Sequence, residues 1–196
     1  MTPPPNRNEM RLPPEVDLSA VTPPERLEGH SVRATHLTFD GAAALSTEIW
    51  VGGAHTAHGA IVGTAEVRDA WILDLAGDLP SILVAEARRH VPKVIQDIEA
   101  VPHDYGRLQA IVEALARSLE GVPGPKEHAG RALPELPAEP PARLYVMCKQ
   151  GLNRSALAAG LLLRAFGLDG AEAVRLLRAG RPGALSNVTF EQLILA

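Results

Sequence analysis

Cysteine is scarce in this chain of 196 residues, which contains only Cys148. A single cysteine excludes an intrachain disulfide framework and a multi-cysteine zinc site, and it fits a reducing compartment. The N-terminal residues lack the apolar core of a secretory signal, and no stretch approaches about 18 uninterrupted apolar residues. The sequence therefore predicts a cytoplasmic protein without a membrane-spanning helix.

An excess of positive charge is also missing. Lys and Arg number 19 against 23 Asp and Glu, which gives a formal net charge of −4. No global basic field is therefore present to gather nucleic acid or an anionic membrane, which argues against both as partners. An anionic ligand would have to be held by a local arrangement of groups. Hydrophobic residues at 46% and charged residues at 21% are typical of a folded globular domain.

Proline divides the chain into segments. Of the 17 prolines, seven lie in residues 1–24 and six in residues 121–142. Residues 1–30 are predicted to form a Pro-rich flexible leader, because repeated Pro-Pro pairs deny the backbone its regular hydrogen bonds. Residues 121–142 are predicted to be a long Pro/Gly-rich loop, and the sequence leaves open whether this loop covers a site or is a plain insertion.

Elsewhere, short apolar runs alternate with amphipathic stretches, which favours an α/β fold with a largely buried sheet. Helices are expected where apolar residues recur at helical spacing or where a capping pattern precedes them. The expected strands are residues 49–51, 70–75, 94–101 and 144–148. The expected helices are residues 107–120, residues 156–166, one opened by Asp169 and ending near Arg181, and a last one after Asn187.

The segment from Leu144 to Ala156 has the order strand, glycine-containing loop, helix. Free amides at a helix start and in a curled loop form a concave site for a dianion the size of phosphate. Arg154 can grip two oxygens of such an anion at once. A lone cysteine at a strand end is by default a small buried hydrophobe. With Gly151, Arg154 and Ser155 in register, Cys148 is better interpreted as a nucleophile whose thiolate form the loop favours.

The order Cys148, five residues, Arg154, Ser155 resembles the C-x5-R-S/T signature loop of cysteine-dependent protein tyrosine and dual-specificity phosphatases. The residues Ile49 to Gly53, Trp71 to Leu75 and Arg181 to Asn187 are similar to further segments of the dual-specificity phosphatases. The resemblance implies a mixed, largely parallel sheet flanked by helices, with the active loop at the carboxyl end of a central strand. It also implies that residues 31–196 form one phosphatase-like catalytic domain, with an insertion at 121–142.

By this resemblance, Cys148 attacks phosphorus and forms a phosphocysteine that water then hydrolyses. The oxygens of the phosphoryl group would be bound by the Arg154 side chain and by the amides of the loop, and Ser155 would ease departure of the sulfur. The loop amides belong to Lys149, Gln150, Gly151, Leu152, Asn153 and Arg154. Whether Lys149 and Gln150 contribute more than their amides is left open. The resemblance implies no metal or organic cofactor, and a phosphorylated protein or peptide as substrate.

The family uses an aspartate upstream of the nucleophile as general acid, and Asp104 is the best match to that position. Asp104 precedes the helix expected at 107–120, so it is also a candidate helix N-cap. Asp74, Asp78 and Asp97 are interpreted as residues of strand faces or turns. The resemblance gives Asn187 the role of bracing the active loop, and the alternative is that it only caps the last helix.

The sequence departs from the family at one position, and other functions stay open. Met147 stands where the family usually has a histidine. A phosphatase acting on RNA 5′-phosphates or phosphoinositides, and a non-catalytic phosphate-binding module (a pseudophosphatase), are the alternative functions. His55 and His58 lie three residues apart, but no third metal ligand accompanies them, so ordinary loop histidines are expected.

Overall fold

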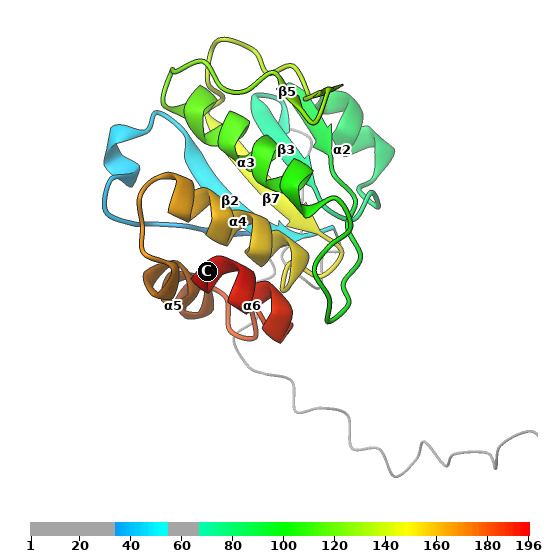
Figure 1. Cartoon of the computed structure of the whole chain (residues 1–196). Helices are drawn as coiled ribbons and strands as arrows, with labels where there is room; N and C mark the ends of the chain where they lie inside the picture. The colour runs from blue at the N-terminus through cyan, green and yellow to red at the C-terminus, as the bar shows by residue number, and fades with distance from the viewer. Residues whose placement is uncertain (1–33, 55–66) are drawn as a thin grey trace, which may run out of the picture.

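A computed structural model describes residues 34–54 and 67–196. The expected leader at 1–30 and the pair His55 and His58 lie outside the described residues. The described chain forms a central sheet with helices on both faces (Figure 1).

The main sheet has five strands in the order β1-β2-β7-β3-β4. All neighbouring pairs are parallel except β1 with β2, which are antiparallel. The strands are β1 Thr35–His36, β2 Glu48–Gly53, β3 Ala70–Asp74, β4 Arg89–Pro92 and β7 Arg143–Cys148. The expected α/β class, with a mixed and largely parallel sheet, is confirmed. The strands predicted at 49–51, 70–75 and 144–148 are confirmed as β2, β3 and β7.

Strand β7 lies at the centre of the sheet, between β2 and β3. Leu144, Val146 and Cys148 belong to the larger core cluster, whereas Tyr145 and Met147 belong to the smaller one on the opposite face. Because both faces are covered, every β7 side chain after its first residue is buried. Cys148 ends this strand, paired in register with Gly53 of β2.

Helices cover the two faces unequally (Figure 1). On one face, α3 and α4 lie side by side, and α5 and α6 pack against α4. On the other face, Leu83 of α2 belongs to the smaller core cluster. The helices are α2 Ser81–Glu86, α3 Tyr105–Leu119, α4 Arg154–Ala165, α5 Gly170–Gly180 and α6 Val188–Leu195, with a 3-10 turn, η2 Ala42–Ala44. The four predicted helices are confirmed as α3 to α6, and Asp169 caps α5 by accepting from the amide of Ala171.

The strand predicted at 94–101 is wrong. Pairing with β3 ends at Pro92, and residues 93–104 form a loop, called here the 93–104 loop. Only Ile95 of the predicted strand turns its side chain into the core, while Val94, Ile98 and Val101 are exposed. The apolar spacing therefore reflects an exposed aliphatic surface and not a buried sheet face.

The segment 121–142 is more ordered than a plain loop. It contains a two-stranded hairpin of β5 Glu127–His128 and β6 Arg131–Ala132. Arg107 of α3 holds this hairpin by donating to the carbonyls of Arg131 at 3.4 Å and Ala132 at 2.7 Å. A cavity of about 560 Å³ lies between α3 and residues 121–138, and no residue of the 148–154 segment lines it.

Candidate active site

Cys148 lies at the carboxyl end of β7, at the start of the segment 148–154, called here the cysteine loop. The residue is 2% exposed. Its Sγ accepts a hydrogen bond from the amide of Gly151 at 3.1 Å, and Ser155 Oγ lies 3.3 Å away. The sequence therefore folds back on itself so that a loop amide and a helix hydroxyl both face the sulfur.

The carbonyls of residues 148–152 in the cysteine loop are all bonded on the same side of the loop, which is called its rear. The amide of Ala54 donates to the carbonyls of Cys148 and Lys149 at 2.8 and 3.2 Å. Arg181 donates to the next two carbonyls, and the amide of Leu185 donates to that of Leu152 at 3.0 Å. In a trans peptide the carbonyl and the amide of one unit point in opposite directions. These five bonds consequently leave the amides facing the opposite side, as in an anion-binding nest.

Gly151 is required by the loop geometry. Its φ is +73°, a conformation that residues with a side chain rarely adopt. A Cβ at this position would lie 2.5 Å from the carbonyl carbon of Gly52 and 2.6 Å from the amide nitrogen of Gly53. The loop therefore packs directly on the backbone of β2, and only glycine fits.

Arg154 opens α4, and its side chain is 15% exposed. Its Nη1 donates to the carbonyl of Ile95 at 3.4 Å. Among residues 34–54 and 67–196, the buried Nε has no hydrogen-bond partner, and the carboxylate oxygen of Asp97 lies 3.9 Å from it. A buried donor without a partner is rare, and an anion oxygen would satisfy it.

Asp97 lies on the 93–104 loop beside the cysteine loop, and not on a strand face as the sequence predicts. Its carboxylate accepts from Asn153 Nδ2 at 3.4 Å and from Asn187 Nδ2 at 3.3 Å, in addition to the contact with Arg154. Had the strand been predicted to end at Pro92, as β4 does, the place of Asp97 near the site could have been predicted too. In that case Asp97 follows a parallel strand, at the same sheet edge as Cys148, where ligands of α/β sheets bind.

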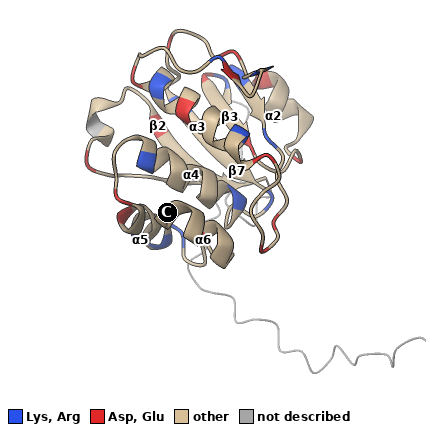
Figure 2. Ribbon diagram, in the orientation of Figure 1, with Lys and Arg blue, Asp and Glu red and all other residues tan. Residues whose placement is uncertain are grey.

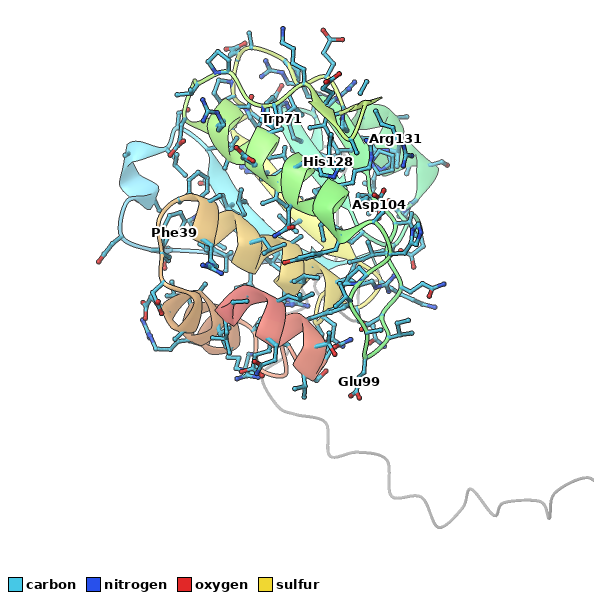
Figure 3. All side chains as sticks on the ribbon, in the orientation of Figure 1. Phe39, Trp71, Glu99, Asp104, His128 and Arg131 are labelled. Atoms are coloured by element: carbon cyan, nitrogen blue, oxygen red, sulfur yellow. The ribbon has the colours of Figure 1, made fainter. Side chains whose placement is uncertain are left out.

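Asp104 lies at the N-terminus of α3 with φ +61°, and its side chain makes no capping bond. Its carboxylate is paired with Lys93 at 3.3 Å and Arg131 at 3.6 Å, and Figure 3 shows it beside Arg131. Burial works to raise the pKa of Asp104, but the hydrogen bond from Lys93 and the nearby cations outweigh it, so the pKa lies below its ordinary value. None of its bonds to described residues reaches the cysteine loop, and its role as general acid stays a prediction.

Asn187 both caps the last helix and contacts the active loop, the two alternatives that the sequence left open. Its Oδ1 accepts from the amide of Phe190 at 3.2 Å, which caps α6. Its Nδ2 donates to the carbonyl of Ile98 at 2.8 Å and to Asp97, while its own amide donates to Asn153 Oδ1 at 3.1 Å. One buried side chain thus ties together α6, the 93–104 loop and the cysteine loop.

Arg181 is a residue of this site for which the sequence predicts no role. It is 6% exposed and lies behind the cysteine loop. Burial lowers the pKa of Arg181, and the nearby Cys148 works in the opposite direction. The only sequence signal was its place in the segment before Asn187 that resembles the dual-specificity phosphatases, and no local pattern says where its side chain points.

The surroundings of the site carry charges of both signs, and Figure 2 shows them interspersed over the ribbon in this view. Lys149 and Gln150 are exposed on the cysteine loop. Within the described ranges, no three His, Cys, Asp or Glu side chains are grouped so that they could hold a metal ion. No helix among these residues is long and apolar enough to cross a membrane.

No family model matches the chain, and no curated protein matches it by sequence. Solved structures do match. Human DUSP28 is 22% identical with a TM-score of 0.51, over 74% of this chain and 84% of that one. The Yvh1 phosphatase domain from Chaetomium thermophilum is 19% identical with a TM-score of 0.51, over 83% and 93%. Kinase associated phosphatase, with its catalytic-site cysteine substituted by serine, is 17% identical with a TM-score of 0.50, over 85% and 94%.

These similarities show that the chain has the fold of dual-specificity and protein tyrosine phosphatases. The fold that the resemblance implied is therefore confirmed.

Proposed function

We propose that this protein is a cysteine-dependent phosphomonoesterase that hydrolyses phosphorylated proteins or peptides. One observation carries the proposal: the sulfur of Cys148 accepts from the amide of Gly151, and the carbonyls of residues 148–152 are bonded on the opposite side of the loop, which leaves the loop amides free for an anion. Such amides stabilise an anion without reorganisation during the reaction. The buried Nε of Arg154, which has no hydrogen-bond partner in the described part of the chain, adds a charged donor for a phosphoryl oxygen beside this loop.

The reaction would proceed in two steps. The Cys148 thiolate attacks phosphorus in line, the S–P bond forms as the P–O bond to the leaving group breaks, and the leaving oxygen takes a proton from an acid. Water then attacks phosphorus and gives a proton to the conjugate base of that acid, the S–P bond breaks to return the thiolate, and inorganic phosphate leaves. The Ser155 hydroxyl, 3.3 Å from Sγ, stabilises the departing thiolate in this second step.

Asp97 is our candidate for the general acid, in place of Asp104. A general acid must come within hydrogen-bonding reach of the leaving oxygen. Contacts of Asp97 with Asn153 and Arg154 support a position beside the bound phosphoryl group, whereas the carboxylate of Asp104 is engaged by Lys93 and Arg131.

The exposed aliphatic side chains near the site favour a protein substrate over RNA or a phosphoinositide. Val94 and Ile98 on the 93–104 loop are 60% and 52% exposed, and Val188, next to Asn187, is 58% exposed. The same loop carries the acidic Asp97 and Glu99, and Figure 3 shows Glu99 at its outer tip. Acidic groups repel a polyphosphate backbone or an anionic lipid surface, while exposed aliphatic groups suit apolar side chains of a peptide.

The test is hydrolysis of p-nitrophenyl phosphate by the reduced protein, without added metal and at mildly acidic to neutral pH. The matched variant is Cys148→Ser. We expect turnover in the native protein and none in the variant. Binding of phosphate without turnover in the native protein would refute the enzyme and would favour the non-catalytic phosphate-binding module.

A further inference from the structure

Arg181 follows α5 and directs its guanidinium at the rear of the cysteine loop. Its Nε donates to the carbonyl of Gly151 and its Nη2 to that of Gln150 at 3.2 Å. Its Nη1 donates to Thr35 Oγ1 on β1 at 3.3 Å. The three nitrogens of one side chain therefore connect the loop with the edge strand of the sheet.

We propose that Arg181 is a positioning residue with two effects: its guanidinium holds two loop carbonyls outward so that the loop amides face the anion, and its charge stabilises the Cys148 thiolate from behind. The inference rests on the proposed function only in taking the anion to be a phosphoryl group. Arg181 does not touch the anion, because it lies on the carbonyl side of the loop.

The geometric effect follows from the shape of the guanidinium. Two adjacent carbonyls need two donors at a fixed separation, and a planar fork supplies them, whereas a lysine offers one point charge. The absence of a side chain at Gly151 makes room for the fork, since a Cβ there would lie 2.7 Å from Arg181 Nη2. The observed position of the Arg181 guanidinium therefore depends on the absence of a side chain at residue 151.

The electrostatic effect follows from burial. A cation in a poorly solvated place acts on a nearby charge more strongly than one in water. Burial works to lower the pKa of Arg181 and Cys148 works to raise it, so cation and sulfur stabilise each other. Met147, which precedes the nucleophile, is fully buried and carries no charge of its own.

A purely structural role for Arg181 would be to brace the turn between α5 and α6. Arg178 does this independently: it pairs with Glu191 at 2.9 Å and donates to the carbonyls of Ala184 at 3.5 Å and Leu185 at 3.2 Å. None of these bonds reaches residues 149–153. Arg178 is therefore a matched control, an arginine that stabilises the same turn without contacting the rear of the loop.

The experiment compares Arg181→Met, Arg181→Lys and Arg178→Met in the full chain. The thiolate is titrated by its ultraviolet absorption, which reports Cys148 alone because the chain has one cysteine, with Cys148→Ser as the blank. Affinity for tungstate, an unreactive oxyanion, is measured by calorimetry. Neither measurement requires turnover.

For Arg181→Met we expect the thiolate midpoint to move to higher pH and tungstate affinity to fall about tenfold or more, in line with the loss of an aligned donor set. For Arg181→Lys we expect a midpoint close to the native one but weaker tungstate binding, because the charge is kept and the fork is lost. Arg178→Met should have the native values of both.

The proposal is overturned if folded Arg181→Met keeps the native thiolate midpoint and the native tungstate affinity, or if Arg178→Met changes both quantities as much as Arg181→Met does. Should Arg181→Met fail to fold, the Thr35→Val variant supplies the test: it removes one acceptor of the Arg181 guanidinium and keeps the charge, so tungstate should bind more weakly while the thiolate midpoint stays unchanged. Native tungstate affinity in Thr35→Val would then refute the proposal. A native protein without turnover whose variants still follow this pattern would refute the proposed function and leave the role of Arg181 standing.

Discussion

The cysteine loop is held in different ways on its two sides. Behind it, backbone amides and the Arg181 guanidinium bond five successive carbonyls, and Gly151 packs directly on the backbone of β2. In front of it, the 93–104 loop makes longer contacts of 3.4 to 3.9 Å with Asn153 and Arg154 and leaves aliphatic side chains exposed.

The tightly bonded rear and the loosely bonded front of the cysteine loop suit two different tasks. An anion site gains most when its donors are fixed before the ligand arrives, and the rear of the loop provides that rigidity. A surface that meets a protein partner must accommodate varied side chains, and the exposed aliphatic side chains of the 93–104 loop, whose contacts with the cysteine loop are long, are suited to that task. Substitutions behind the loop should therefore affect anion binding and stability, whereas substitutions in front should affect proton transfer and substrate choice.

Arg154→Met should have the largest effect on activity. It removes the Nε donor that lies between the two sides and that no described residue satisfies, and we expect kcat/KM for p-nitrophenyl phosphate to fall about 1000-fold. Arg131→Met is the control, because the exposed Arg131 pairs with Asp104 and not with the cysteine loop. A loss below tenfold in Arg154→Met would show that the amides bind the phosphoryl group without this side chain.

Asp97→Asn and Asp104→Asn distinguish the two candidate acids. For Asp97→Asn we expect about a 100-fold loss of kcat on a phosphotyrosine peptide, because the leaving oxygen then lacks its proton donor. The loss on p-nitrophenyl phosphate should be smaller, since nitrophenolate departs readily without a proton. The reverse result, a loss confined to Asp104→Asn, would restore the aspartate expected from the sequence.

Gly151→Ala tests the rear of the loop through stability. Both the positive φ and the contact with the backbone of β2 oppose a side chain, and we expect a loss of about 2–4 kcal/mol in the free energy of unfolding. Gly130→Ala in the β5-β6 turn has a matching φ of +70° but open space around it, so it should lose about 1 kcal/mol. Equal losses on chemical denaturation would mean that backbone strain alone decides.

Ile98→Ser combined with Val188→Ser tests the front of the site. We expect KM for a phosphopeptide with apolar neighbours to rise a few-fold, because the exposed aliphatic contacts are lost, and hydrolysis of p-nitrophenyl phosphate to stay unchanged. The control is Ile82→Ser, which removes an equally exposed side chain on α2. An unchanged KM would remove the support for a peptide-binding surface here.

The smallest effect concerns Asp104 and pH. Because its folded-state pKa lies below the ordinary value, its ion pairs contribute stability above the unfolded pKa, and this contribution is lost as pH falls through the lowered pKa. Asp104→Asn should therefore lower Tm slightly at neutral pH and not at strongly acidic pH, as expected for ion pairs that are partly open to solvent. An equal Tm difference at both pH values would exclude the ion pairs as its cause.

The sequence predicted the local units of the fold well, because each is set by residues close together in the chain. Helical spacing of apolar residues gave α3, and the capping aspartate Asp169 marked the start of α5. The prediction failed at residues 94–101, where alternating aliphatic residues resemble a half-buried strand. Which of these side chains meets a core depends on where β4 stops pairing with β3, and that is a non-local contact.

The same division applies to the candidate site. Cys148, Gly151, Arg154 and Ser155 lie within one turn-and-helix unit, so their spacing alone was enough to predict an anion cradle around a thiol. Asp97 and Arg181 come from distant parts of the chain, and only the packing of the 93–104 loop and of the end of α5 brings them to that cradle. The sequence by itself was enough to predict Cys148 as the nucleophile and an anion site around it, because a contiguous loop builds that arrangement. Only the tertiary structure decided that Asp97 and Arg181 are the aspartate and the arginine next to this loop. The direction of a side chain at the end of a strand or helix depends on contacts that no local pattern encodes.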